Sequence, residues 1–322
     1  MRMLATFVLL SILVPFGAAR AQPEAAKAKA RTYVDVIEGN NDFSFALYKR
    51  LREDQRPNAI VSPFSVSTIL LMTYAGARGK TAEEMTSVLN IPRGTEPAEL
   101  CAGCGGLIDE LTKRSPDRKY RLDIANRLWF GQGVSLLDSF TGTLKTHYGA
   151  EAGRVDFAAS PENARSEINQ WVATHTENQI KDLLAAGTVG PETRLVLANA
   201  LFFKGTWDLP FPKESTSPAP FAISLKENVQ VPMMRQEGRF RYAVHDQLQI
   251  LELTYSDKAL AMIIILPKQV DGLRQIEEVL SSERLEGLER SMSDRKVQVY
   301  LPRFRISSNY RLAGPLKEMG LT

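Results

Sequence analysis

Histidine and cysteine are scarce in this chain, which excludes several kinds of chemistry at the outset. Its 322 residues include three histidines and two cysteines. His147, His175 and His245 have no second ligand at metal-binding spacing, and none lies in a nucleophile elbow such as G-x-S-x-G. No pair of carboxylates stands out from the charged surface pattern. We therefore expect no enzyme, metal or cofactor site, with a hydrolase whose triad is scattered along the chain as the alternative.

Long apolar runs are missing as well, and the charges nearly balance. The one early run, 4–16, follows Arg2 and precedes the small residues of Ala19-Arg20-Ala21, so residues 1–21 are predicted to be a cleaved export signal, too short to span a membrane. Removing its two arginines from 40 basic residues leaves 38 against 37 acidic ones. That balance favours neither a nucleic acid nor a membrane as partner. We expect a secreted protein, extracellular or periplasmic.

The domain organisation expected from composition is simple. The Ala- and Lys-rich stretch after the signal suggests a flexible leader over residues 22–40, and residues 41–322 have the apolar content of one large globular domain. The chain would be a monomer.

The two cysteines, Cys101 and Cys104, form a single C-x-x-C motif. A thioredoxin-like redox motif would lie between a strand and a helix, whereas CAGCGG is a glycine-punctuated stretch before a helical pattern. A zinc site would need two more ligands. The simplest interpretations are a local disulfide, or two thiols with no chemical role, and a redox motif is the remaining alternative.

Glycine-rich segments do not predict a nucleotide site. Gly79-Lys80-Thr81 resembles the end of a phosphate loop, but that motif needs a glycine where Tyr74 stands and a strand upstream. Thr81 and Glu84 fit a capping box for a helix over 82–89 better.

A cluster of basic residues surrounds one surface turn and could bind a polyanion. Asp117 interrupts the cluster, and a solvated surface is the simpler interpretation. Its members are Lys113, Arg114, Arg118, Lys119 and Arg121.

The segment 193–221 organises the rest of the chain. Residues 195–203 form an apolar run interrupted only by Asn199, which predicts a strand buried on both faces in the centre of a sheet. A buried amide needs a partner, because an unpaired one costs about 1–3 kcal/mol. Ser62 and Ser65, at the start of a buried helix beginning at Pro63, are the candidates.

Further elements follow from periodicity and turn residues. We expect a helix from Asn41, a short strand at 58–62, and helices over 135–148, 161–184 and 272–280. Strands are expected at 121–130, 154–157, 229–234, 238–244, 248–254, 260–266 and 296–306.

Several blocks of sequence together resemble the serpin family of serine-protease inhibitors. They run in family order through most of the chain and read NAIVSPFSVSTILLMTYAGARGKTAEEM, INQWVATHTENQI, LANALFFKGTWDLPF, VQVPMM and VQVYLPRFRISSNYRL. The resemblance implies an α+β fold with three β-sheets surrounded by helices. It also implies a long loop near the C-terminus that baits a serine or cysteine protease, is cleaved once, and then inserts into the main sheet as a new strand.

Site residues carry over by position only. Ser62, Ser65 and Asn199 match the family's shutter cluster beneath the main sheet, and Trp207 matches the breach, where insertion begins. The helix over 161–184 matches the one that crosses the sheet. Ordinary capping and core packing would account for each of these residues equally well.

The resemblance stops at Thr322, before the bait loop and the last strands, so we expect this chain to be a fragment that cannot itself trap a protease. Its strand at 195–203 would then have an unpaired edge. The leading hypothesis is a secreted suicide-substrate inhibitor. The alternative is a non-inhibitory serpin-fold protein that binds a ligand or acts as a chaperone or structural protein.

Overall fold

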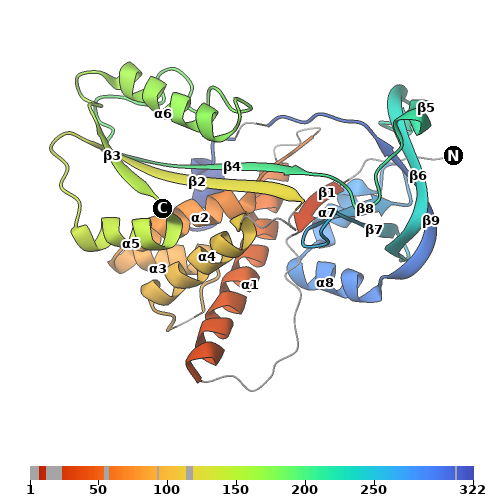
Figure 1. The fold of residues 1–322 in the computed structure, drawn as a ribbon, viewed down its shortest axis with the longest axis horizontal. Coiled ribbons are helices and arrows are strands. Elements are labelled where there is room, and N and C mark those ends of the chain that lie inside the picture. The colour runs from red at the N-terminus through yellow and green to blue at the C-terminus, as the bar shows by residue number, and fades with distance from the viewer. Residues whose placement is uncertain (1–6, 12–23, 54–57, 93, 114–118, 309) are drawn as a thin grey trace.

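The computed structural model describes residues 7–11, 24–53, 58–92, 94–113, 119–308 and 310–322. Its helices and strands are gathered around two sheets (Figure 1). The mixed α+β class is confirmed. Three sheets were expected, but the described strands form two. The reason is β6 (Asn228–Val244), a single strand of 17 residues where two were predicted, which joins the strands on its two sides into one sheet.

The smaller sheet has three strands in the order β3-β2-β4. Strand β2 (Tyr120–Gly131) lies in the middle, parallel to β3 (Glu151–Val155) and antiparallel to β4 (Leu195–Gly205). Helix α6 (Pro161–His175) lies over one face. On the other face lie α2 (Pro63–Tyr74), α4 (Pro97–Thr112) and α5 (Asp138–Tyr148) (Figure 1).

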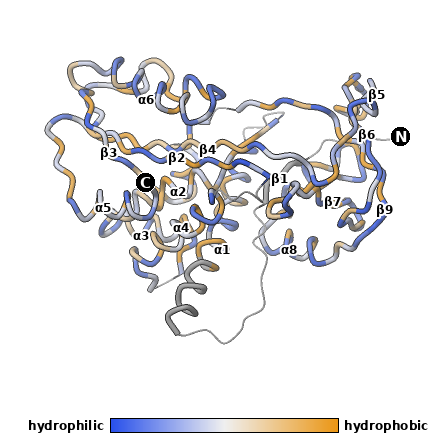
Figure 2. The backbone as a smooth tube through the Cα atoms, in the orientation of Figure 1, coloured by the Kyte–Doolittle hydropathy of each residue, from blue (hydrophilic) through white to orange (hydrophobic). Residues whose placement is uncertain are grey.

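Residues of β2 and β4 alternate between these two helical layers, as expected for a sheet covered on both faces. Leu122, Leu128 and Leu201 belong to the core on the side of α2 and α4. Trp129 and Ala198 belong to the smaller core under α6. Hydrophobic residues accordingly recur along both strands (Figure 2).

The larger sheet has the order β1-β8-β7-β6-β5, with β9 also paired to β6. A buried apolar cluster that includes Ile250, Ile263 and Leu288 fills the space between this sheet and its helices. The remaining members are β1 (Phe7–Ser11), β5 (Ser217–Ala222), β7 (Leu248–Thr254), β8 (Ala261–Pro267), β9 (Ser293–Pro302), α7 (Leu273–Val279) and α8 (Ser282–Ser291).

The N-terminal part differs from expectation in one respect. Helix α1 runs over Glu24–Glu53, so the predicted start at Asn41 is wrong and most of the segment 22–40 is helical. The described part of the predicted export signal, β1, pairs antiparallel with β8. Cleavage of the signal and flexibility of the leader stay predictions. Among the described residues, no helix combines the length and apolar character that crossing a bilayer requires.

Two local predictions in the segment 58–88 are wrong. Residues 58–61 are not a strand in the described chain, and Ile60 is exposed. Helix α3 (Gly79–Val88) has Arg78 at its N-cap and no side-chain cap, so Thr81 lies inside the helix and not at its start. Glu84 accepts hydrogen bonds from the backbone N–H (3.0 Å) and Oγ1 (2.6 Å) of Thr322, beyond α9 (Ala313–Glu318). The predicted capping box is therefore wrong.

Candidate functional site

Strand β4 forms an edge of the smaller sheet. It pairs with β2 along Leu195–Gly205, and among the described strands it has no neighbour on its other side. The prediction that this segment is a strand is confirmed, and so is the expected unpaired edge. The expected central position, buried on both faces, is wrong: β4 is an edge strand, and most of its residues are half-buried while Ala198 and Ala200 are buried. The edge presents a row of backbone groups that can hydrogen-bond a further strand.

The amide of Asn199 finds its partner on the neighbouring strand. Asn199 and Asn126 lie directly opposite each other in the β2–β4 register. Asn199 Nδ2 donates to Asn126 Oδ1 (2.8 Å), and Asn126 Nδ2 donates to the backbone carbonyl of Tyr148 at the end of α5 (2.9 Å). Asn126 is 4% exposed. This amide ladder ties β4 through β2 to the helical layer.

The prediction that Ser62 and Ser65 hydrogen-bond the amide of Asn199 is therefore wrong. Ser62 caps α2 as predicted: its Oγ accepts from the backbone N–H of Ser65 (3.4 Å) and donates to Ser65 Oγ (2.9 Å). The two hydroxyls satisfy each other locally. Helix α2 does pack against β4, so the serines lie beneath the strand without bonding its amide.

One atom of this cluster has no partner among the described residues. Asn199 Oδ1 is buried and accepts no hydrogen bond. A buried acceptor without a donor costs about 1–3 kcal/mol. Because Asn199 sits on the edge strand, its empty acceptor lies beside the place that a further strand would occupy.

Asn126 was missed in the sequence, although a signal was present. Alternate residues of β2 share one face, and on the face that includes Leu122, Ile124 and Leu128 the single polar residue is Asn126. Asn199 interrupts the corresponding face of β4 in the same way. Two lone amides on the same faces of two strands would have predicted a cross-strand pair.

Trp207 lies where β4 leaves the smaller sheet and reaches the larger one. Its ring stacks on Tyr255 (centroids 4.5 Å apart, planes at 14°), and the two residues form an isolated antiparallel bridge. Tyr255 also meets Phe203 edge-on at 4.9 Å. A Cβ at Gly205 would lie 2.7 Å from Tyr255 Cδ1, so glycine is needed for this approach. Trp207 thus occupies the expected place at the end of β4, and its role in insertion stays a prediction.

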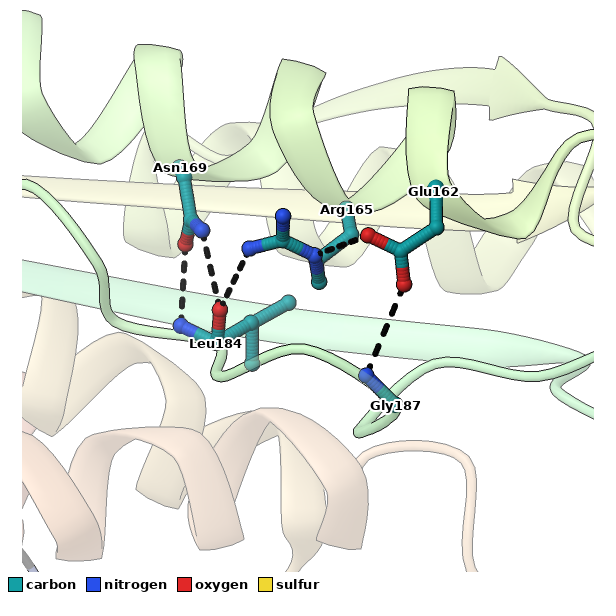
Figure 3. A network of polar contacts seen from close by, with 5 residues as sticks. All are labelled: Glu162, Arg165, Asn169, Leu184 and Gly187. Carbon is teal, nitrogen blue, oxygen red and sulfur yellow. Dashed lines mark hydrogen bonds and ion pairs between the residues drawn. The ribbon is translucent and has the colours of Figure 1, made fainter.

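Helix α6 is fastened to the loop that returns from it to β4 (Figure 3). Asn169 binds both backbone groups of Leu184, accepting from its N–H and donating to its carbonyl (each 2.9 Å). Arg165 donates to the same carbonyl (2.9 Å) and to Glu162 (2.7 Å). Glu162 in turn accepts from the N–H of Gly187 (3.5 Å). We call these contacts the α6 clasp.

The contact of α6 with the sheet is mainly apolar, with one hydrogen bond from Trp129 Nε1 to Glu167 Oε1 (3.4 Å). Trp171 meets Trp129 of β2 edge-on (5.1 Å), and His175 lies against Trp171 (4.4 Å). The helix ends at His175, so the predicted continuation to Leu184 is wrong. Dispersion contacts have weaker directional preferences than hydrogen bonds, so the single Trp129–Glu167 bond is the directional contact that a shift of α6 over the sheet would break.

The basic cluster is only partly described. Lys113 and Lys119 are exposed, while Arg114 and Arg118 lie outside the described residues. Arg121 forms ion pairs with Asp123 and with Glu177, just beyond α6, and its guanidinium lies over the ring of Phe202. Arg121 is therefore already engaged by two carboxylates. Polyanion binding stays a prediction.

The described residues offer little support for catalysis. His245 Nε2 contacts Ser291 Oγ (2.7 Å), but that hydroxyl donates to the carbonyl of Leu288 (2.6 Å), so the imidazole donates to the serine instead of activating it. No group of three His, Cys, Asp or Glu in the described chain is arranged to hold a metal ion. Burial raises the pKa of Cys101 and raises that of Cys104 to about 12, which leaves both thiols unreactive.

Comparison with known proteins places this arrangement in a family. Residues 38–322 match the family model described as Serpin (serine protease inhibitor). The chain is 40% identical over 287 residues to an uncharacterized serpin-like protein of Thermococcus kodakarensis, covering 89% of this chain and 65% of that one. It is 37% identical over 286 residues to a leukocyte elastase inhibitor of Xenopus laevis, covering 87% of this chain and 75% of that protein.

The fold agrees with the sequence. The structure of emu ovalbumin (Dromaius novaehollandiae) superimposes with a TM-score of 0.85 at 33% identity, covering 89% of this chain and 78% of that one. The chain thus spans about two thirds to three quarters of the length of its relatives. With its sheets, its edge strand and its ordered sequence blocks, the chain belongs to the serpin family.

Proposed function

We propose that the protein to which this chain belongs is a secreted inhibitor of serine proteases that acts as a suicide substrate. The observation that carries the proposal is the edge of β4, which is open among the described strands and has the empty acceptor Asn199 Oδ1 beside it. An inserted strand that carries a side-chain donor would pair with the backbone of β4 and would also donate a hydrogen bond to Asn199 Oδ1.

Each part of the site has a role in this mechanism. A protease attacks a bait loop and forms an acyl-enzyme, the cleaved loop enters beside β4 from the end marked by Trp207, and the attached protease is carried across the molecule. Helix α6 and its loop lie over the sheet and must shift to admit the strand. The Asn199–Asn126 pair holds β4 to β2 while its other edge is occupied.

Two findings support protease inhibition as the activity. The family model is described by that activity, and a relative of 37% identity is named an inhibitor of leukocyte elastase. Secretion is supported by the apolar run and small residues of 1–21 alone. The partner would be a serine protease, or a cysteine protease, held by a loop that the serpin resemblance places after Thr322.

The test requires the gene product that includes this chain and any sequence following it. Mixed with trypsin-like and chymotrypsin-like proteases, it should form a complex that survives denaturing electrophoresis, with one protease molecule consumed per inhibitor cleaved. Cleavage without any stable complex would contradict inhibition and would favour the alternative of a serpin-fold binding, chaperone or structural protein.

A further inference from the structure

The C-x-x-C motif plays no part in the proposed function, and its position in the fold is unexpected. Cys101 and Cys104 lie in the interior of α4 rather than in a loop before it. Both are free thiols and each is 1% exposed. The interpretation as a local disulfide is therefore wrong for the folded chain.

The turn of α4 that carries the pair is tightly packed. A Cβ at Gly105 would lie 2.5 Å from the backbone oxygen of His147, so α4 and the end of α5 touch through their backbones. The next residue, Tyr148, is buried as well, and its hydroxyl has no hydrogen-bond partner among the described residues. Because the Tyr148 carbonyl accepts from Asn126, this turn is connected through one residue to the amide ladder under β4.

Helical geometry opposes a bond between the two sulfurs. Residues three apart on an α-helix have Cβ atoms about 5–6 Å apart. A disulfide requires about 3.5–4.5 Å between the same atoms. Closing the bond would distort the turn of α4 that packs against His147. The unfolded chain has no such restriction, and only two residues separate the cysteines.

We propose that the redox state of Cys101 and Cys104 controls whether the chain folds. The reduced pair permits α4 to form and is then buried in the core. A disulfide formed between them in the unfolded chain prevents the chain from reaching the native fold. The oxidant is a disulfide such as oxidised glutathione. One cysteine thiolate attacks it and releases one glutathione, and the second cysteine displaces the other glutathione. The protein loses two protons and two electrons, and the oxidant is reduced to two thiols.

This inference is independent of protease inhibition. It concerns the order of two events, folding and oxidation, and it applies most strongly if the chain is exported to an oxidising compartment. Folding first gives a native protein with two protected thiols. Oxidation first gives a chain whose α4 is strained.

The experiment starts from the purified chain in urea, which is diluted either reduced or after oxidation with oxidised glutathione. Circular dichroism follows folding, and mass spectrometry distinguishes an internal disulfide from bound glutathione. We expect the internal disulfide to shift the folding equilibrium toward the unfolded state about a hundredfold or more, and dithiothreitol to restore folding. Folded protein given the same oxidant should keep both thiols and react no faster than it unfolds.

The matched control is Cys101→Ala/Cys104→Ala, which should refold equally well with or without the oxidant. If that variant does not fold, the recovery of oxidised wild-type protein by dithiothreitol is the decisive measurement. Equal refolding of oxidised and reduced wild-type chains would overturn the proposal. So would a disulfide that forms in the folded protein faster than unfolding and leaves its spectrum native.

Discussion

At the scale of single residues, the hydrogen bond between Asn199 and Asn126 is the side-chain contact that joins β4 to β2. Replacing Asn199 by alanine leaves Asn126 Oδ1 without its donor, and we expect a loss of about 1–3 kcal/mol in the free energy of unfolding. In a double-mutant cycle, Asn126→Ala and Asn199→Ala should show a coupling energy of about 1 kcal/mol. Urea denaturation of the four proteins measures it.

The same cycle with Ser65→Ala in place of Asn126→Ala is the matched control. Ser65 bonds Ser62 and not Asn199, so its effect should add to that of Asn199→Ala within about 0.5 kcal/mol. Coupling of Asn199 to Ser65 that exceeds its coupling to Asn126 would restore the partnership that the sequence suggested.

Because the thiol of Cys104 is buried, we expect the free energy of unfolding to decrease at high pH. Burial raises the pKa of this thiol from an ordinary 9.0 to about 12 in the folded chain. Between these values the unfolded chain releases the proton while the folded chain keeps it, so the free energy of unfolding falls as pH rises from about 9 to about 12. In Cys104→Ala this fall should be smaller. Parallel curves for the two proteins would contradict the assignment.

At the scale of elements, α6 and its return loop form the unit that moves in the proposed mechanism when a strand enters. In Asn169→Ala both backbone groups of Leu184 lose a partner, and we expect about 1–3 kcal/mol of destabilisation together with faster hydrogen exchange at the Leu184 amide. Arg165→Ala should cost less, because Asn169 still binds the Leu184 carbonyl.

Gln170→Ala is the control for this prediction. Gln170 is exposed and adjacent to Asn169 on the same helix, so its replacement should change stability by no more than about 0.5 kcal/mol. If Asn169→Ala behaves like Gln170→Ala in both measurements, the clasp does not hold the loop to α6.

The limits of a helix or strand were predictable where the spacing of apolar residues within that element alone specifies it. Strand β7 was predicted at its observed limits, because alternating apolar residues specify a half-buried strand locally. Helix α6 was predicted too long: Ile180 and Leu184 keep a helical spacing, but Glu177 and Asn178 adopt left-handed backbone (φ 48° and 58°). Helix α8 was missed because it buries only Leu285 and Leu288.

Predictions that depended on a distant partner failed more often. The apolar run of β4 marked Asn199 as important, but strand register, which local sequence does not specify, determined that Asn126 lies opposite it. The capping box at Thr81 failed because α3 begins at Gly79, before Thr81, and Glu84 binds a residue 238 positions away. The fold class and family followed from ordered sequence blocks, whereas side-chain partners followed from the tertiary structure.

At the scale of the whole molecule, two sheets meet at Trp207 and Tyr255, and β4 forms the boundary at which the smaller sheet can grow. Both faces of that sheet are covered by helices, so a further strand can be added only at an edge. Among the described strands β3 and β4 are the two edges, and β4, with 11 residues against five in β3, is the longer one. The central claim is therefore that β4 accepts a further strand and that Asn199 lies beside the place it fills.

The most direct measurement is amide hydrogen exchange of the chain with and without an extended peptide rich in Ala, Thr and Gly, compared with a peptide of the same length containing bulky and charged residues. We predict that the small-residue peptide slows exchange at those amides of β4 that do not pair with β2, and that it raises the thermal midpoint. Exchange in β4 that neither peptide changes, or protection confined to the larger sheet, would contradict the claim.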